Sequence, residues 1–273
     1  MRFKFYKAML KILFAALCTF LMVPGVQAKE KYKGTFIYIP LDDRPVTYSY
    51  PVKNLQAAGY EILTPPEKYL ASADRTGDPD KLWQWLVENA PDADAAVISS
   101  DALIYGGLVA SRTHFFDETT LQARVQRLEM LRERLPMPLY VYSTLMRTPR
   151  ASFGNVEPPY YSKIGPAIFR YAELIDKEDM YGLTLRESLT KQALKNNLPQ
   201  ADLNDWLQRR LKNYHVNKSL TELTAKYRFH YLAIGKDDNA PLSATHMEAR
   251  YIKRDAFGLS DQIFQIIPGV DQL

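Results

Sequence analysis

The chain contains almost no cysteine and few histidines. Its single cysteine, Cys18, lies within the first 28 residues, so the rest of the chain can form no disulfide and offers no thiolate nucleophile or cysteine metal ligand. The four histidines lack the HExxH and HxH spacings of zinc sites. The patterns GxGxxG, GxxxxGK[ST] and GxSxG are also missing, which argues against nucleotide cofactors and an α/β-hydrolase serine. We therefore expect no bound cofactor.

The body of the chain also lacks an excess of charge. Its 273 residues include 35 Lys and Arg against 31 Asp and Glu. All of the basic excess lies in residues 1–28, which contain Arg2, Lys4, Lys7 and Lys11 and no acid. Nucleic-acid binding needs a concentrated basic face, so no nucleic-acid partner is expected. A hydrophobic fraction of 47% is ordinary for a globular domain and excludes a disordered chain.

Residues 1–28 have the pattern of a secretory signal peptide. A cationic segment ends at Lys11, an apolar run covers 12–23, and Val26 and Ala28 give the small-x-small cleavage pattern. The apolar run is shorter than the roughly 20 residues that span a bilayer. We expect cleavage, a secreted or periplasmic mature protein from residue 29, and no stable membrane association afterwards. An uncleaved N-terminal anchor is the alternative.

Residues 29–273 read as a single α/β domain. Short apolar runs alternate with helical periodicity, which is typical of βα units around a mostly parallel sheet. The pattern leaves open whether the sheet is an open, doubly wound one or part of a barrel. The expected strands are Thr35–Leu41, Tyr60–Thr64, Ala95–Ser99, Leu139–Ser143, Phe229–Ile234 and Gln262–Ile267. Asp78 and Pro79 predict the start of a helix between the second and third strands.

The interval 162–228 contains no strand signal. Four separate apolar stripes predict several helices there: 164–175, 185–194, 203–211 and 220–227. This helical insertion follows the end of a strand, so it can form a lid over the site or simply fill out the fold. The chain stops just after its last expected strand, which predicts a domain incomplete at its C-terminus.

Polar side chains follow the ends of four expected strands. The carboxyl ends of parallel strands meet at one edge of a sheet, where α/β proteins bind ligands, so these groups predict a shared site. They are Asp42, Asp43 and Arg44 after the first strand, Asp101, Tyr105 and Arg112 after the third, Arg147 after the fourth, and Lys236, Asp237, Asp238 and Asn239 after the fifth. We expect Asp271 to repeat this pattern after the sixth strand, and His246 lies close in sequence to the group after the fifth strand.

Several chemistries suit this set of acids. Two carboxyl groups about 5 to 9 Å apart cleave glycosidic bonds, one protonating the leaving oxygen and the other acting as nucleophile or base. The same acids can instead hold a divalent ion or bind sugar hydroxyls without catalysis. A purely structural alternative is that Asp42, Asp43 or Asp101 caps the helix that follows it.

Three of these segments resemble a known family. They are Pro40-Leu41-Asp42-Asp43-Arg44-Pro45, the run from Ser99 to Arg112 that contains Tyr105-Gly106-Gly107, and the run from Gly235 to Pro241. Together they resemble the bacterial family of unknown function DUF4127. The resemblance locates a site without naming a reaction. It also implies that this chain is an N-terminal portion whose C-terminal half is a missing partner.

The sequence thus predicts a secreted protein that acts on a glycan or another small molecule, as a glycoside hydrolase. Its predicted catalytic residues are Asp42, Asp43, Asp101, Asp237 and Asp238, and its predicted substrate-binding residues are Arg44, Tyr105, Arg112, Arg147, Lys236 and Asn239. A non-catalytic binder of sugars or anions and a divalent-metal-dependent hydrolase are the alternatives.

Overall fold

A six-stranded parallel sheet forms the centre of residues 34–273. The computed structural model describes residues 32–134, 137–152 and 155–271, so the predicted signal peptide lies outside the described residues. The strands run in the order β2-β1-β3-β4-β5-β6, with β2 and β6 at the edges, so the sheet is open rather than a closed barrel. The strands are β1 (Thr35–Ile39), β2 (Glu61–Leu63), β3 (Ala95–Ser99), β4 (Leu139–Leu145), β5 (Tyr231–Lys236) and β6 (Phe264–Pro268).

All six predicted strands are confirmed, with ends that shift by at most two residues. Their runs are rich in β-branched and aromatic residues, which fit a pleated surface that is buried on one or both sides. The strand order reverses direction at β1, which has β2 on one side and β3 on the other. In open α/β sheets, ligands bind outside the carboxyl ends of the strands at such a reversal. The fold therefore directs attention to the segments after β1 and β3.

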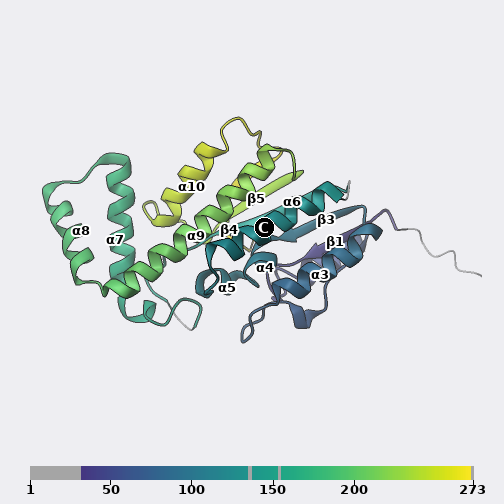
Figure 1. Cartoon of the computed structure of the whole chain (residues 1–273), viewed down its shortest axis with the longest axis horizontal. Helices are drawn as coiled ribbons and strands as arrows, with labels where there is room; N and C mark the ends of the chain where they lie inside the picture. Colours follow the sequence, from purple (N-terminus) through teal and green to yellow (C-terminus); the bar gives the residue numbers. More distant parts are fainter. Residues whose placement is uncertain (1–31, 135–136, 153–154, 272–273) are drawn as a thin grey trace, which may run out of the picture. The chain divides into compact units, whose positions relative to one another are not determined.

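The helices connect the strands in chain order. Figure 1 shows α3, α6, α9 and α10 lying across one face of the sheet. The helices are α2 (Ser49–Ala57), α3 (Pro79–Asn89), α4 (Ser100–Ile104), α5 (Leu108–Thr113), α6 (Glu118–Arg134), α7 (Tyr161–Tyr181), α8 (Leu185–Asn197), α9 (Gln200–Ala225) and α10 (Ala244–Asp255), with two short 3₁₀ turns, η1 (Glu67–Tyr69) and η2 (Ala90–Asp92).

The main core lies between the sheet and α3, α6, α9 and α10. Alternate strand residues such as Ile37, Ile98, Val141 and Ile234 are fully or almost fully buried in it. The intervening residues point to the opposite face, where helix α2 packs on a smaller cluster that includes Tyr38. The period of two along each strand thus separates the two faces.

Local signals fix where several helices begin. The predicted start of α3 is confirmed, because the Asp78 carboxylate accepts from the backbone N–H of Lys81 at 3.0 Å and Pro79 is the first helical residue. Thr184 and Glu187 form a reciprocal capping box at the start of α8. Such caps satisfy backbone donors that have no partner within the helix. They also fix the position of the loops that precede each helix.

The insertion contains three helices rather than the expected four, because the last two apolar stripes belong to one helix, α9. The buried face of α9 includes the polar residues Arg210, Asn213 and Asn217. These polar side chains interrupt the apolar period, so the sequence reads as two shorter helices. The predicted insertion itself is confirmed as wholly helical. Its helix α7 contacts α8 and α10, and α9 lies beside α6 and α10 (Figure 1).

None of the helices in the described ranges has the length and apolar character needed to cross a membrane.

Candidate functional site

The loop after β1 carries the first group of predicted site residues. The Asp42 carboxylate accepts from Nε of Arg44 at 2.9 Å and from the hydroxyl of Thr47 at 2.5 Å. Nη1 of Arg44 lies 3.0 Å from Asp271, which follows β6, so one guanidinium joins the segments after β1 and β6. Asp42 does not cap α2, because the residue before that helix is Tyr48. Its contacts organise the loop itself.

Asp101 lies directly after β3, in the first turn of α4, and is completely buried. Ser99 caps this helix by accepting from the N–H of Ala102 at 3.2 Å, so Asp101 is not the cap. One carboxyl oxygen of Asp101 accepts from the Thr144 hydroxyl at 2.8 Å. The other, Oδ2, has no partner among the described residues. One oxygen of a fully buried carboxyl group is therefore without a hydrogen-bond partner.

Burial raises the pKa of Asp101 to about 7. The hydrogen bond from Thr144 opposes this rise, the negative charge of Asp237 adds to it, and the positive charge of Arg112 lowers it. A carboxyl group in an apolar site is neutral more readily than one in water, since burial disfavours its charged form. Near neutral pH, Asp101 can therefore hold a proton and give it up.

Asp237 and Arg112 form a buried ion pair between the segments after β5 and β3. Burial raises the pKa of Asp237, while the charges of Arg112 and Arg147 oppose that rise. Arg147, after β4, lies 2.5 Å from the buried carboxylate of Glu157, which is also 3.6 Å from Arg112. Three strand ends thus contribute to one network of alternating charges. Asp101 forms no ion pair with the described residues, so no paired guanidinium opposes the effect of burial on its pKa as Arg112 does for Asp237.

The two groups of charges share a buried neighbour, Tyr142 on β4. Its hydroxyl donates to the carbonyl of Ile39 at 3.0 Å. Burial is the main cause that raises the pKa of Tyr142, and the negative charges of Asp42 and Asp101 add to it. Both carboxyl groups are therefore within electrostatic range of one hydroxyl. The structure brings the ends of β1, β3, β4 and β5 into one charged region.

Within this region carboxylates outnumber guanidinium groups. Arg44, Arg112 and Arg147 each face at least one carboxylate, and the carboxylates in these pairs are Asp42, Asp237, Glu157 and Asp271. An anionic ligand would add to this excess of negative charge. The balance favours a neutral ligand with many hydroxyl groups over an anion.

Asp238 differs from its neighbour Asp237. Its two carboxylate oxygens accept from the backbone N–H groups of Thr148 and Ala240 and from the hydroxyls of Ser243 and Thr245, at 2.7 to 3.2 Å. All of these partners belong to the loops after β4 and β5 or to the start of α10. This saturated carboxylate holds the loops in position, which leaves Asp237 as the residue of the pair that faces charged groups.

The remaining predicted residues have varied settings. Tyr105 is buried, with its ring 4.9 Å from that of His114, so it is not an exposed platform for a sugar ring. The side chains of Asp43 and Lys236 are half-buried and that of Asn239 is exposed, and none of the three side chains has a hydrogen-bond or ion-pair partner among the described residues. These three groups are available to bind a ligand beside the charged region.

The pair Gly106-Gly107 shapes the turn between α4 and α5. Both residues have positive φ, 94° and 119°, and a Cβ at Gly107 would lie 2.5 Å from the Cβ of Ala71. The backbone N–H groups of Gly106 and Gly107 donate to the carbonyl of Asp101 at 3.0 Å. Only glycine permits both this backbone conformation and the close approach of the segment around Ala71. The turn therefore fixes the backbone of Asp101.

Sequence reasoning missed Glu157 and the buried pair Arg210–Glu248. Glu157 lies in an irregular segment without any periodic signal. Arg210 and Glu248 lie on the buried faces of α9 and α10, and a charged residue within an apolar stripe is the signal that could have identified them. Nη1 of Arg210 also donates to the carbonyl of Met146 at 2.8 Å, so the pair supports the segment after β4.

Nδ1 of His246 forms a hydrogen bond of 2.6 Å with Oδ2 of Asp176, a fully buried residue of α7. The same carboxylate accepts from the N–H of Ser243 and from Arg250. The Ser243 hydroxyl accepts from the backbone N–H of His246 and bonds to Asp238, not to the imidazole. These contacts attach the helical insertion to α10 and do not form a serine–histidine nucleophile.

Among the described residues there is no group of three or more His, Cys, Asp or Glu side chains arranged to hold a metal ion. The acids are matched instead by guanidinium and hydroxyl groups. This arrangement suits proton transfer and hydroxyl recognition.

No curated protein and no solved structure matches the chain. The profile of the family described as "Protein of unknown function (DUF4127)" matches residues 36–273, a range that contains all three segments of the predicted resemblance. The chain therefore belongs to the DUF4127 family.

Proposed function

We propose that this protein hydrolyses glycosidic bonds in a neutral glycan, with Asp101 as the general acid. The observation that carries this proposal is a buried carboxyl group with one unpartnered oxygen and a pKa of about 7. A general acid works best when its pKa lies near the working pH. Asp101 also lies at the reversal of strand order, where open α/β sheets bind their ligands.

Asp237 is the proposed second carboxyl group, acting as nucleophile or base. Burial raises the pKa of Asp237, but its ion pair with Arg112 opposes that rise and favours the charged form, whereas Asp101 pairs with no cation among the described residues. Two carboxyl groups in environments that separate their protonation states are the usual basis of acid and base assignments in such enzymes. Asp42, Arg44 and Asp43 are proposed to bind sugar hydroxyls at the neighbouring strand end.

Leaving-group dependence tests the role of Asp101. A general acid assists departure of a poor leaving group far more than departure of a good one. With a panel of 4-methoxyphenyl glycosides, Asp101→Asn should lower kcat by about 10²- to 10⁴-fold. With the matching 2,4-dinitrophenyl glycosides, which need no protonation, the loss should be under about tenfold.

The matched control is Asp92→Asn, which removes an exposed carboxylate just before β3, at the opposite end of that strand from Asp101. It should leave both substrates unaffected. Equal losses for both leaving groups in Asp101→Asn would refute the general-acid role. Tight binding of a glycan without any turnover by the unchanged protein would instead favour a non-catalytic sugar binder.

We also propose that the protein is exported. The support is the pattern of residues 1–28 in the sequence. Mass spectrometry of the protein recovered from the periplasm or the medium should find a mature N-terminus at Lys29. A chain that keeps Met1 to Ala28 in the cytoplasm would contradict export.

A further inference from the structure

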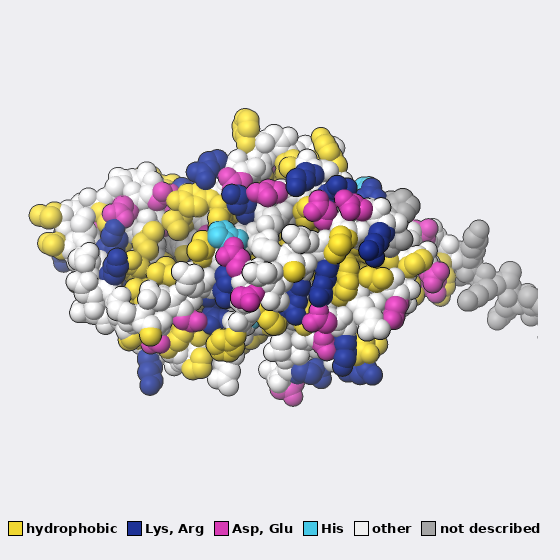
Figure 2. All heavy atoms as spheres, viewed as in Figure 1, with side chains coloured by type: hydrophobic (Ala, Val, Ile, Leu, Met, Phe, Trp, Pro, Cys, Tyr) yellow, Lys and Arg dark blue, Asp and Glu magenta, His cyan; other side chains and the backbone are white. Residues whose placement is uncertain are grey.

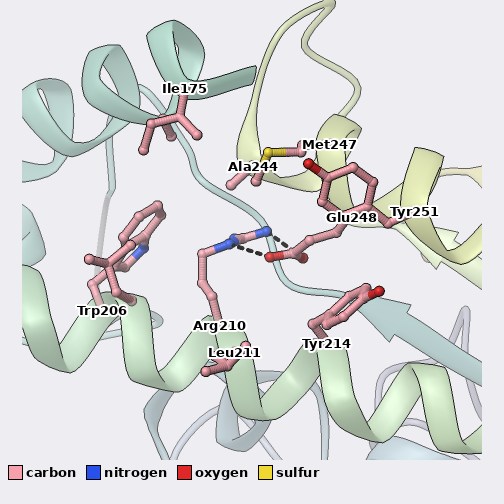
Figure 3. A pocket seen from close by; sticks show the side chains of 11 residues that line it. Ile175, Trp206, Arg210, Leu211, Tyr214, Ala244, Met247, Glu248 and Tyr251 are labelled. Carbon is pink, nitrogen blue, oxygen red and sulfur yellow. Dashed lines mark hydrogen bonds and ion pairs between the residues drawn. The ribbon is translucent and has the colours of Figure 1, made fainter. Parts of the chain in front are cut away.

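The helical insertion and α10 line a half-open cavity of about 240 Å³, and none of the strand-end aspartates or arginines of the candidate site lines it. Figure 3 shows Trp206, Leu211 and Tyr214 on α9 opposite Ile175 on α7, with Met247 and Tyr251 on α10. Hydrophobic side chains also gather on the surface between α7, α9 and α10 in Figure 2. Side chains from three helices therefore line the cavity, and most of these side chains are apolar.

The floor of the cavity carries a buried ion pair. Nε and Nη2 of Arg210 donate to the two carboxylate oxygens of Glu248 at 2.9 and 2.7 Å, and both side chains are at most 9% exposed (Figure 3). Nη1 of Arg210 donates to the carbonyls of Met146 and Arg147 and to the hydroxyl of Thr148. The guanidinium is thus neutralised and almost fully hydrogen-bonded. A charged ligand would find no counter-charge here, so the cavity favours an uncharged one.

Trp206 supplies a free hydrogen-bond donor. The residue is 1% exposed, and its indole N–H has no acceptor among the described residues. The guanidinium of Arg210 lies over the indole ring, 5.3 Å from its centre, and Trp206 is one of the residues that line the cavity (Figure 3). A buried donor without an acceptor costs about 1–3 kcal/mol, so an oxygen placed in the cavity would relieve that cost.

The size of the cavity sets the size of the ligand. An apolar protein cavity of about 150 Å³ holds a benzene molecule. A cavity of about 240 Å³ has room for one substituted ring or two fused rings. We propose that this cavity binds a small uncharged ring compound that carries one acceptor oxygen, with Trp206 donating its indole N–H to that oxygen. This inference does not depend on the proposed hydrolase activity.

A matched pair of probes tests the proposal on the full chain. Acetophenone has a ring and an acceptor oxygen, and ethylbenzene has a similar shape without the oxygen. Saturation-transfer NMR and calorimetry should detect both, with acetophenone binding more tightly. Trp206→Phe should weaken acetophenone binding about three- to tenfold, the range expected for one lost hydrogen bond, and leave ethylbenzene binding unchanged.

Trp85→Phe is the matched control, because Trp85 packs against the main core and not on this cavity. It should bind both probes as the parent does. If Trp206→Phe does not fold, Met247→Trp fills the cavity from its half-buried edge and should abolish binding of both probes. The proposal is overturned if neither probe binds the parent at millimolar concentration, if Trp206→Phe affects both probes equally, or if Met247→Trp binds them normally.

Discussion

The ionisation of Asp101 should make the stability of the protein depend on pH in a defined window. The pKa of this buried carboxyl group is about 7, against an ordinary value of 3.8. Between these two values the folded protein keeps a proton that the unfolded chain has lost. The free energy of unfolding therefore falls as pH rises from about 4 to about 7, by about 1.4 kcal/mol per pH unit, and levels off above 7. The full contribution is roughly 4 kcal/mol.

Asp101→Asn removes this ionisation and keeps an acceptor for the Thr144 hydroxyl. Urea unfolding of parent and variant at each pH from 4 to 8 gives the difference in free energy directly. The variant should match the parent near pH 4 and exceed it by up to roughly 4 kcal/mol at pH 8. Asp92→Asn serves again as the exposed control and should show no such trend. A difference that stays constant across the range would refute the raised pKa and, with it, the proton-donor role.

Three further substitutions test the supports of the site. Arg210→Met should lower the free energy of unfolding by about 3–5 kcal/mol, because it leaves Glu248 buried and unpaired. In urea unfolding, the double variant with Glu248→Leu should recover most of this loss. An equal loss in the single and the double variant would show that the two side chains are not coupled. Asp238→Ala should cost about 2–4 kcal/mol, since several donors lose their acceptor, and a neutral result in the same assay would contradict the loop-holding role. Gly107→Ala should cost about 3 kcal/mol through positive φ and the clash with Ala71, and an unchanged thermal midpoint would disprove that packing.

The strands of the sheet could be predicted because their signal is local. Runs such as Ala95–Ser99 combine β-branched and small apolar residues between turn residues, and they form strands with little help from distant parts of the chain. The shared edge followed from the parallel topology, since consecutive βα units bring their strand ends together. The continuity of α9 could not be predicted, because Asn213 and Asn217 occupy its buried face and bond to carbonyls of other elements.

Local sequence patterns could not predict which side chains of the site pair with one another. Arg112 and Asp237 are 125 positions apart, and only the fold determines that they meet. Asp238 accepts hydrogen bonds from the loops, whereas Asp237 pairs with Arg112. The sequence cannot distinguish these two adjacent aspartates, because the difference depends on which donors the fold brings to each carboxylate. Tyr105 was predicted to bind substrate but is buried in the core. The sequence could not separate these two roles, because an aromatic side chain suits a hydrophobic core as well as a ligand site.

The most direct test of the central claim is to digest a pool of neutral glycans in water enriched in ¹⁸O with the protein and with its Asp101→Asn variant. Mass spectrometry of the products reports bond cleavage and the entry of solvent oxygen together. The parent protein should give shorter glycans with ¹⁸O at the new reducing end, and the variant should give about 10²-fold less product or lower. Glycans that bind the parent but remain intact, or equal cleavage by parent and variant, would contradict the claim that Asp101 is the proton donor of a glycoside hydrolase.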